Sequence, residues 1–136
     1  MTDFRRVTEG FSVAPQLTLE DLSAAKTAGF KTIICNRPDH EHGPDQATIE
    51  DMQAKAESLG LVFLALPFSG FPQQETVAQQ GALLEAAETP VLAYCRSGTR
   101  SITAWALSQA GQGRRADIVE SAAAAGYDLS SIAENL

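Results

Sequence analysis

The 136-residue sequence predicts an α/β fold in which a mostly parallel central sheet is flanked by helices. Two observations indicate this class: short apolar runs end at polar or proline-containing loops, and segments with helical periodicity separate these runs. Strands that are apolar on both faces and alternate with amphipathic helices favour a parallel sheet covered on both sides. The length suits a single domain over residues 1–136.

The first part of the chain predicts an edge hairpin and a helix. Apolar residues surround a Glu-Gly pair in residues 4–15, as in a small hairpin at the margin of a sheet. Thr18 is a suitable N-cap, Asp21 stands where a capping box has its acid, and Gly29 is a suitable C-terminal stop. A helix is therefore expected between Thr18 and Gly29.

The rest of the chain alternates between strand-like and helix-like segments. Each strand-like segment is a short apolar run, and the helix-like segments carry apolar residues along one face. The C-terminal segment is mostly helix-like, with an interruption at Gly126-Tyr127. We expect strands at 31–38, 61–68 and 90–94, helices at 45–60 and 73–88, a helix after residue 100, and two short helices within 114–136.

Composition and charge exclude several classes of partner. The formal charge is −7 and the pI is near 4.7, which opposes binding to nucleic acid or to an anionic membrane surface. The charged N-terminus lacks the apolar core of a signal peptide, and the longest apolar run, 61–68, is too short to span a bilayer, so we expect a cytoplasmic protein. The two cysteines form no disulfide framework, and no Cys/His spacing resembles a zinc site. We therefore expect neither a metal nor another cofactor.

The stretch VLAYCRSGTRSITAW, residues 91–105, carries the clearest chemical signal. An apolar strand ends at Cys95, a short polar loop follows, and a helix-compatible segment comes next. Ligands of open parallel sheets bind beyond the carboxyl ends of the strands. Backbone N–H groups in such a loop can surround an anion, and the following helix adds the positive end of its dipole. The loop residues expected to bind substrate in this way are Arg96, Ser97, Gly98 and Thr99.

Three residues in and just after this loop favour a reactive thiolate at Cys95. Gly98 permits an unusual backbone angle, Arg100 presents a planar fork for two phosphate oxygens, and Ser101 can donate a hydrogen bond to the sulfur. A cysteine at the end of a buried strand is more often a small core residue. The succession of cysteine, glycine-containing polar loop, Arg-Ser and apolar helix is a much rarer coincidence. We therefore expect Cys95 to be the centre of a site.

The loop resembles the active-site loop of cysteine-dependent phosphatases of the dual-specificity kind. More closely, SVAPQLTLEDL, CNRPD, CRSGTRS and AAAAGYDL resemble, over nearly the whole chain, a bacterial family named as the phosphatase-like domain of beta-lactamase-hydrolase-like proteins. The first resemblance implies the fold of these phosphatases and a cysteinyl-phosphate intermediate. Members of the bacterial family also occur fused to persulfide-metabolising enzymes, which implies sulfur transfer as an alternative.

Three departures from the phosphatase pattern bear on mechanism. Four residues separate Cys95 from Arg100, where these phosphatases have five and rhodaneses have four. The strand and helix order suits the phosphatase fold, and no rhodanese-like Gly-His-Ile-Pro-Gly-Ala segment is present. Tyr94 replaces the histidine that precedes the nucleophile. The dual-specificity general acid, an aspartate just after the second core strand, is absent from Phe68-Ser69-Gly70.

The loop after the first core strand, NRPDHEHGPD, offers a replacement acid. Asp39 follows that strand and should lie at the same end of the sheet as Cys95, so we predict that it is the general acid, with a turn residue as the alternative. Arg37 either binds anion oxygens or pairs with an acidic neighbour. His40, His42 and Asp45 are weaker candidates for the acid. The two histidines have no evident third partner for a metal.

These residues lead to a phosphatase hypothesis with two alternatives. We expect a cysteine-dependent hydrolase of phosphate monoesters, with Cys95 as nucleophile and Arg100 stabilising the transferred group. Its substrate would be a phosphorylated small molecule or a phosphoprotein. The first alternative is a sulfurtransferase or persulfide carrier that takes sulfane sulfur on Cys95, and the second is an anion-binding module with low turnover. For Cys35, core packing is preferred over a disulfide or a sulfur relay.

Overall fold

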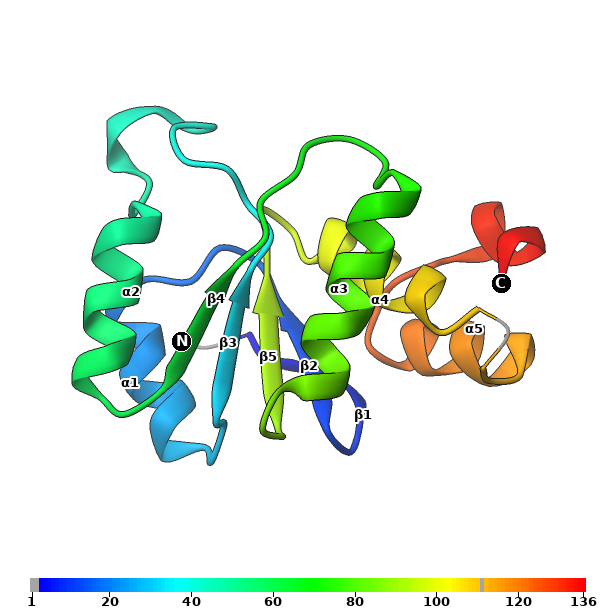
Figure 1. Ribbon diagram of the computed structural model, residues 1–136, viewed down its shortest axis with the longest axis horizontal. Coiled ribbons are helices and arrows are strands. Elements are labelled where there is room, and N and C mark those ends of the chain that lie inside the picture. The colour runs from blue at the N-terminus through cyan, green and yellow to red at the C-terminus, as the bar shows by residue number, and fades with distance from the viewer. Residues whose placement is uncertain (1–2, 111) are drawn as a thin grey trace.

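The computed structural model describes residues 3–110 and 112–136. Within these residues, five strands form one sheet in the order β1-β2-β5-β3-β4, shown in Figure 1. The first pair is antiparallel and every other neighbouring pair is parallel, so the expected mostly parallel sheet is confirmed. The strands are β1 (Arg5–Thr8), β2 (Phe11–Ala14), β3 (Thr32–Cys35), β4 (Val62–Ala65) and β5 (Val91–Tyr94).

Helices cover both faces of this sheet (Figure 1). Helices α1 and α2 bury apolar side chains in one core cluster, and α3, α4 and α5 contribute to a second cluster on the opposite face. The two layers confirm the expected α/β class. The helices are α1 (Leu19–Thr27), α2 (Ile49–Ser58), α3 (Gln74–Ala86), α4 (Thr99–Ser108) and α5 (Arg115–Ala124), with 3-10 turns η1 (Gly43–Asp45) and η2 (Ser130–Asn135).

Side-chain alternation along β3 connects the sequence to these two clusters. Ile33 and Cys35 lie in the cluster beneath α1 and α2, whereas Ile34 lies in the opposite cluster. Successive side chains of a strand point to opposite faces, so a strand buried on both sides must be apolar at every position that packs. All four residues of β2, β3 and β5 are buried, which explains why these strands are short continuous runs in the sequence.

The expected capping of the first helix is present. Asp21 N–H donates to Thr18 Oγ1 at 3.1 Å, and Thr18 N–H donates to Asp21 Oδ2 at 2.9 Å, which makes a complete capping box at the start of α1. Gly29 follows the helix with a φ of 98°, in the left-handed region that glycine adopts without a steric cost. Local chemistry therefore fixes both ends of α1.

Two expectations about the elements need correction. Residues 61–68 were expected to form a strand buried on both faces, but β4 lies at the edge of the sheet and Val62 is 47% exposed. Apolar composition does not distinguish an edge strand from a central one, because position in the sheet depends on long-range pairing. The second C-terminal helix is a 3-10 turn, η2, while α5 is a regular helix that ends before Gly126.

The parallel strands bring three separate loops together at the carboxyl end of the sheet, where β2, β3 and β5 finish. Asn36 N–H, just after β3, donates to the carbonyl oxygen of Tyr94 at 2.8 Å. Cys95 N–H, just after β5, donates to the carbonyl oxygen of Ala14, and Gln16 N–H donates to the carbonyl oxygen of Arg96. The segments that follow β2, β3 and β5 are thus tied to one another by backbone hydrogen bonds. Among the described residues, no helix is long and apolar enough to cross a membrane.

Candidate active site

The loop between β5 and α4 places the Cys95 thiol at its base. Cys95 is 0% exposed, and its Sγ accepts a hydrogen bond from the backbone N–H of Gly98 at 3.1 Å. The sulfur therefore sits inside the curl of the loop, as the sequence predicted.

Gly98 is required at the turn for two independent reasons. Its φ is 93°, a left-handed conformation that is costly for a residue with a side chain. A Cβ atom at this position would also overlap the Tyr127 hydroxyl oxygen. Helix α4 begins directly after this turn, with Gly98 as its N-cap residue. The glycine thus allows the loop to reverse direction and the helix to start within a few residues of the sulfur.

Tyr127 supports the loop from the C-terminal segment. Its hydroxyl donates to the carbonyl oxygen of Ser97 at 2.8 Å, and the residue is buried. The Arg5 guanidinium lies 5.1 Å from the centre of the Tyr127 ring, within the range of a cation–π contact. Burial raises the pKa of Tyr127, so the hydroxyl keeps the proton that it donates to the loop. The Tyr127 side chain therefore supports the loop at Ser97 and Gly98.

The start of α4 supplies hydrogen-bond donors for an anion. The first N–H groups of a helix have no carbonyl acceptor within the helix, and they carry the positive end of its dipole. In α4 these belong to the first turn, which begins at Thr99. Thr99 N–H makes a long contact of 3.4 Å to Ser97 Oγ, and Ser97 Oγ also donates to Thr99 Oγ1 at 3.0 Å. The arrangement suits the phosphate-sized anion that the sequence predicted.

Arg100 is held by three hydrogen bonds that leave one edge of its guanidinium available. Its Nη1 donates to the carbonyl oxygen of Phe68 at 2.8 Å and to Glu41 Oε2 at 2.9 Å, and its Nη2 donates to Glu41 Oε1 at 2.7 Å. A guanidinium has five N–H donors, so the Nε hydrogen and one Nη2 hydrogen make no hydrogen bond to the described residues. These two hydrogens point along one edge, and such an edge has the geometry to bind two oxygens of a phosphate.

Glu41 joins two arginines in one ion cluster. Besides Arg100, it accepts a hydrogen bond from Arg37 Nε at 2.8 Å, and Arg37 Nη1 donates to Gln16 Oε1 at 3.0 Å. The hydrogen bonds from Arg100, and after them the one from Arg37, hold the pKa of Glu41 below its usual range. Of the two alternatives for Arg37, the structure shows the pair with an acidic neighbour.

The same carboxylate raises the pKa of Arg100, and the charge of Cys95 adds to this effect. Arg100 therefore lies within the electrostatic reach of the sulfur as well as of Glu41. A guanidinium with a raised pKa stays protonated throughout the physiological range, so it can stabilise negative charge at any pH at which the fold persists. Arg100 and Cys95 thus belong to a single site.

Ser101 differs from its expected contact. Its hydroxyl donates to Asn36 Oδ1 at 2.9 Å, whereas the sequence predicted a hydrogen bond from Ser101 to the Cys95 sulfur. Asn36 and Gln80 pair through both amide groups, at 3.0 and 3.1 Å. All three side chains are buried, and a buried amide oxygen that lacked its donors would be costly. The Ser101 hydroxyl proton is therefore used in the hydrogen bond to Asn36, just after β3.

The loop after β3 places Asp39 at the start of a helix. Its Oδ1 accepts the N–H of Ile49, the first residue of α2, at 2.8 Å. The sequence offered a turn residue as the alternative for Asp39 and did not predict this contact with α2. The role of Asp39 as general acid remains a prediction. His40, His42 and Asp45 lie in exposed positions of the same loop. In the described parts of the chain, no three His, Cys, Asp or Glu side chains are grouped as a metal site would need.

The two cysteines have different surroundings. Cys35 Sγ donates to the carbonyl oxygen of Arg37 at 3.3 Å and belongs to the core cluster beneath α1 and α2, together with Tyr94. Burial raises the pKa of Cys35, which keeps it in the unreactive thiol form. Both cysteines are free. Core packing, the preferred hypothesis for Cys35, agrees with these contacts.

A hollow of about 340 Å³ lies beside Arg100. Phe71 and Pro72 form an apolar side, and Phe71 is 60% exposed. Thr99 and Thr103, from the first turns of α4, form the opposite side. A group attached to an anion in the loop would therefore meet an apolar surface next to the charged one.

Comparison with known proteins identifies the family of this fold and loop. Residues 3–112 match the family described as "Beta-lactamase hydrolase-like protein, phosphatase-like domain". The chain belongs to this family. A beta-lactamase hydrolase-like protein of Agrobacterium fabrum is 34% identical over 128 residues, which cover 91% of this chain and 29% of that protein. The chain thus spans less than a third of the length of this curated relative.

Solved structures agree with the fold and with the family. A Neisseria meningitidis protein described as a candidate phosphatase superimposes with a TM-score of 0.86 at 34% identity, covering 98% of this chain and 96% of its own. A cysteine-to-serine variant of P. aeruginosa TpbA in complex with phosphotyrosine has a TM-score of 0.68 at 16% identity, covering 92% and 75%. The first is a relative at 34% identity, and the second shares the fold. The chain is a phosphatase-like domain.

Several residues of the site were not predicted from the sequence. Glu41 was overlooked because the loop after β3 contains four other titratable residues, and no spacing marks one of them as the partner of Arg100. Tyr127 lies outside the matched residues 3–112, although the AAAAGYDL segment had been noted as part of the resemblance. Gln80 lies in the helix expected at 73–88 but was not singled out, and it is fully buried. Only contacts between distant segments reveal these three roles.

Removing the Tyr127 hydroxyl should impair the loop while leaving the fold intact. Tyr127→Phe keeps the ring in the core but loses the hydrogen bond to Ser97. We expect kcat/KM for an aryl phosphate to fall roughly tenfold, since 1.4 kcal/mol of lost transition-state stabilisation has that effect. The matched control is Tyr94→Phe, because the chain's other tyrosine is buried in the opposite cluster beside Cys35. Equal losses in both variants would contradict a specific role for Tyr127.

Glu41 should make folding stability depend on pH in a defined direction. Because its pKa is lowered in the fold, the ionised carboxylate stabilises the native state above the unfolded value of about 4.3, and this stabilisation is lost as the pH falls through the folded value. Urea unfolding should therefore show a deficit in Glu41→Gln at neutral pH that disappears in strong acid. Glu57→Gln, on the exposed surface of α2, is the control. A deficit that persists unchanged in acid would contradict the ion cluster.

Proposed function

We propose that the chain is a cysteine-dependent phosphatase that hydrolyses phosphate monoesters through a cysteinyl-phosphate intermediate. The observation that supports this most is the free edge of Arg100, two N–H donors left over by Glu41 and Phe68 beside a sulfur within the loop. A phosphoryl group needs such a fork together with N–H donors and a nucleophile. The family and the fold are consistent with this function.

The reaction would proceed in two displacements at phosphorus. The Cys95 thiolate attacks the phosphorus, an S–P bond forms, the P–O bond to the leaving group breaks, and the departing oxygen takes a proton. Water then attacks the cysteinyl phosphate, gives up a proton, and breaks the S–P bond, which releases phosphate and the thiolate. Arg100 and the first N–H groups of α4 would hold the three phosphoryl oxygens in both steps.

We propose Arg96, Ser97, Gly98 and Thr99 as the backbone part of the substrate site. Arg37 would act from outside it, because its Nε and Nη1 are bound to Glu41 and Gln16. Ser101 would fix the first turn of α4 to the end of β3 through Asn36. These roles keep the residues predicted from the sequence but move Arg37 and Ser101 from the reacting atoms to the support around them.

The expected substrate is a phosphorylated small molecule or a phosphoprotein. The apolar side formed by Phe71 and Pro72 favours a phosphate attached to an apolar or aromatic group. A tyrosine-phosphatase-like neighbour with phosphotyrosine bound supports the same class. A cytoplasmic location is part of the proposal, because a reducing compartment keeps Cys95 as a free thiol.

A second candidate function is sulfane-sulfur transfer. The four residues between Cys95 and Arg100 favour it, since this spacing is the one that the sequence shares with rhodaneses. Here the thiolate would take a sulfur atom from thiosulfate, release sulfite, and pass the sulfur to cyanide or a thiol. This chemistry needs no strong general acid.

Replacement of the nucleophile provides the first test. Cys95→Ser should lose at least 10³-fold, an order-of-magnitude expectation for a missing covalent catalyst, in hydrolysis of p-nitrophenyl phosphate. The matched control is Cys35→Ser, because both cysteines are buried in the same region and only one faces the loop. Thiosulfate:cyanide transfer is assayed in the same preparations. Phosphate hydrolysis that survives in Cys95→Ser contradicts the proposal, and transfer without hydrolysis favours the second function.

Asp39→Asn tests the predicted general acid while keeping the hydrogen bond from the first N–H of α2. An asparagine oxygen can still accept the N–H of Ile49, but the amide cannot donate a proton to a leaving group. A positioned acid contributes about 10²–10⁴ in rate when the leaving group is basic. We therefore expect a large loss with an alkyl phosphate and a small loss with p-nitrophenyl phosphate. Equal rates for the variant and the original protein on both substrates would leave Asp39 with only its structural role, the hydrogen bond to the N–H of Ile49.

A further inference from the structure

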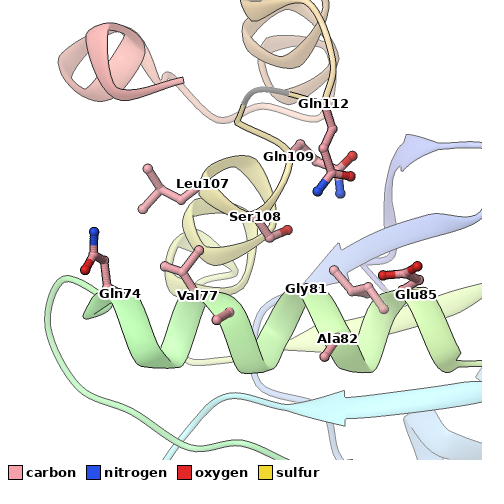
Figure 2. A pocket seen from close by; sticks show the side chains of 11 residues that line it. Gln74, Val77, Gly81, Ala82, Glu85, Leu107, Ser108, Gln109 and Gln112 are labelled. Carbon is pink, nitrogen blue, oxygen red and sulfur yellow. The ribbon is translucent and has the colours of Figure 1, made fainter.

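A groove of about 610 Å³ lies between α3 and α4, beyond the site described above. Figure 2 shows its two ends: Gln74, Val77 and Leu107 gather at one, and Glu85 and Gln109 at the other. Gln74 is the first residue of α3, so this end of the groove lies toward the carboxyl ends of the parallel strands, where the Cys95 loop is found. The groove therefore runs away from the loop along the two helices.

A third hollow adjoins both the groove and the hollow beside Arg100. The hollow beside Arg100 shares Phe71 and Pro72 with this third hollow of about 420 Å³. The third hollow in turn shares Gln74, Val77 and Leu107 with the groove. Three adjoining hollows thus follow one another from Arg100, past the apolar side at Phe71, to the far ends of α3 and α4.

The length of the groove suits a short extended peptide. Gln74 and Glu85 line its two ends. Eleven residues of helix rise about 16 Å, and an extended chain needs about five residues to cover that distance. A small phosphate ester would fill only the hollow beside Arg100 and leave the rest of the groove empty.

The lining of the groove has the chemistry that a peptide backbone requires. The side-chain amides of Gln74, Gln109 and Gln112 each offer donors and an acceptor, as backbone N–H and C=O groups need. Val77 and Leu107 provide apolar surface for side chains, and Ala78 and Ala82 leave room between the helices. Glu85 at the far end favours a basic residue there.

We propose that this groove binds the polypeptide on one side of a phosphorylated residue, so that the substrate class is a phosphorylated peptide or protein. The proposal rests on the phosphatase function proposed above. The series of adjoining hollows favours this occupant, since it begins beside Arg100, where the phosphoryl group would be held, and reaches the groove through the hollow at Phe71 and Pro72. A second copy of the chain is disfavoured because each copy carries a formal charge of −7.

Two matched substitutions on α3 test the groove. Ala78 lines it, whereas the adjacent Gln79 does not, and both are exposed. Ala78→Arg should block the groove, and Gln79→Arg adds the same charge outside it. The substrates are p-nitrophenyl phosphate, phosphotyrosine amide, and phosphotyrosine peptides with five neutral residues on either the N-terminal or the C-terminal side.

Because the groove leaves the loop in one direction, extension on one side should raise kcat/KM over phosphotyrosine amide by about tenfold, and extension on the other side should not. Ala78→Arg should abolish this gain and leave p-nitrophenyl phosphate unaffected, while Gln79→Arg keeps the gain. Aryl phosphate turnover without any gain from either extension would overturn the groove proposal but not the phosphatase.

Binding to Cys95→Ser separates docking from turnover. Titration calorimetry with the same peptides should show tighter binding of the favoured extension, and Ala78→Arg in this background should remove the difference. Tighter binding that survives Ala78→Arg would overturn the proposal. Absence of aryl phosphate turnover in the unmodified protein would defeat the phosphatase function, and the calorimetry would still decide whether the groove binds peptide. A change of sedimenting mass in Ala78→Arg would assign the groove to a contact between copies and overturn the proposal.

Discussion

The ion cluster of Arg37, Glu41 and Arg100 is the interaction on which the geometry of the site depends. It joins the loop after β3 to the start of α4, and it uses three of the five Arg100 donors when the Phe68 carbonyl is included. Without Glu41, the positive charges of Arg37 and Arg100 would lie near each other with no shared carboxylate between them. With it, one edge of Arg100 has a fixed direction and remains available to a phosphoryl group. A chain with a formal charge of −7 thus has a local cluster of positive charge beside the Cys95 loop.

Packing on the other side of the loop complements this cluster. Tyr127 lies close to Gly98, and its hydroxyl donates a hydrogen bond to the carbonyl oxygen of Ser97. Arg5 of the edge strand β1 lies over the Tyr127 ring. The C-terminal segment therefore contacts the loop directly, and β1 contacts it through Tyr127. The match to the family ends at residue 112, yet the loop depends on a side chain beyond it. The C-terminal segment therefore contacts the Cys95 loop as well as covering the core.

The sequence predicted the α/β class, the order of the elements and the loop, because each depends on local patterns: apolar runs, a capping box and the Cys-loop-helix succession. It did not predict Glu41 as the partner of Arg100, the Tyr127 support or the commitment of Ser101 to Asn36. Each of these contacts joins residues at least 30 positions apart, and its geometry arises only when the sheet forms. The edge position of β4 was missed for the same reason.

The most direct test of the account is the rapidly quenched intact mass of the protein after mixing with an aryl phosphate, and separately with thiosulfate. The account predicts a gain of one phosphoryl group that requires Cys95, is retained in Cys35→Ser, and accompanies release of the phenol. A stable gain of one sulfur atom from thiosulfate, with no phosphoryl adduct and no phenol, would contradict it. The protein would then be a sulfurtransferase built on a phosphatase fold, and the short loop would be the decisive feature.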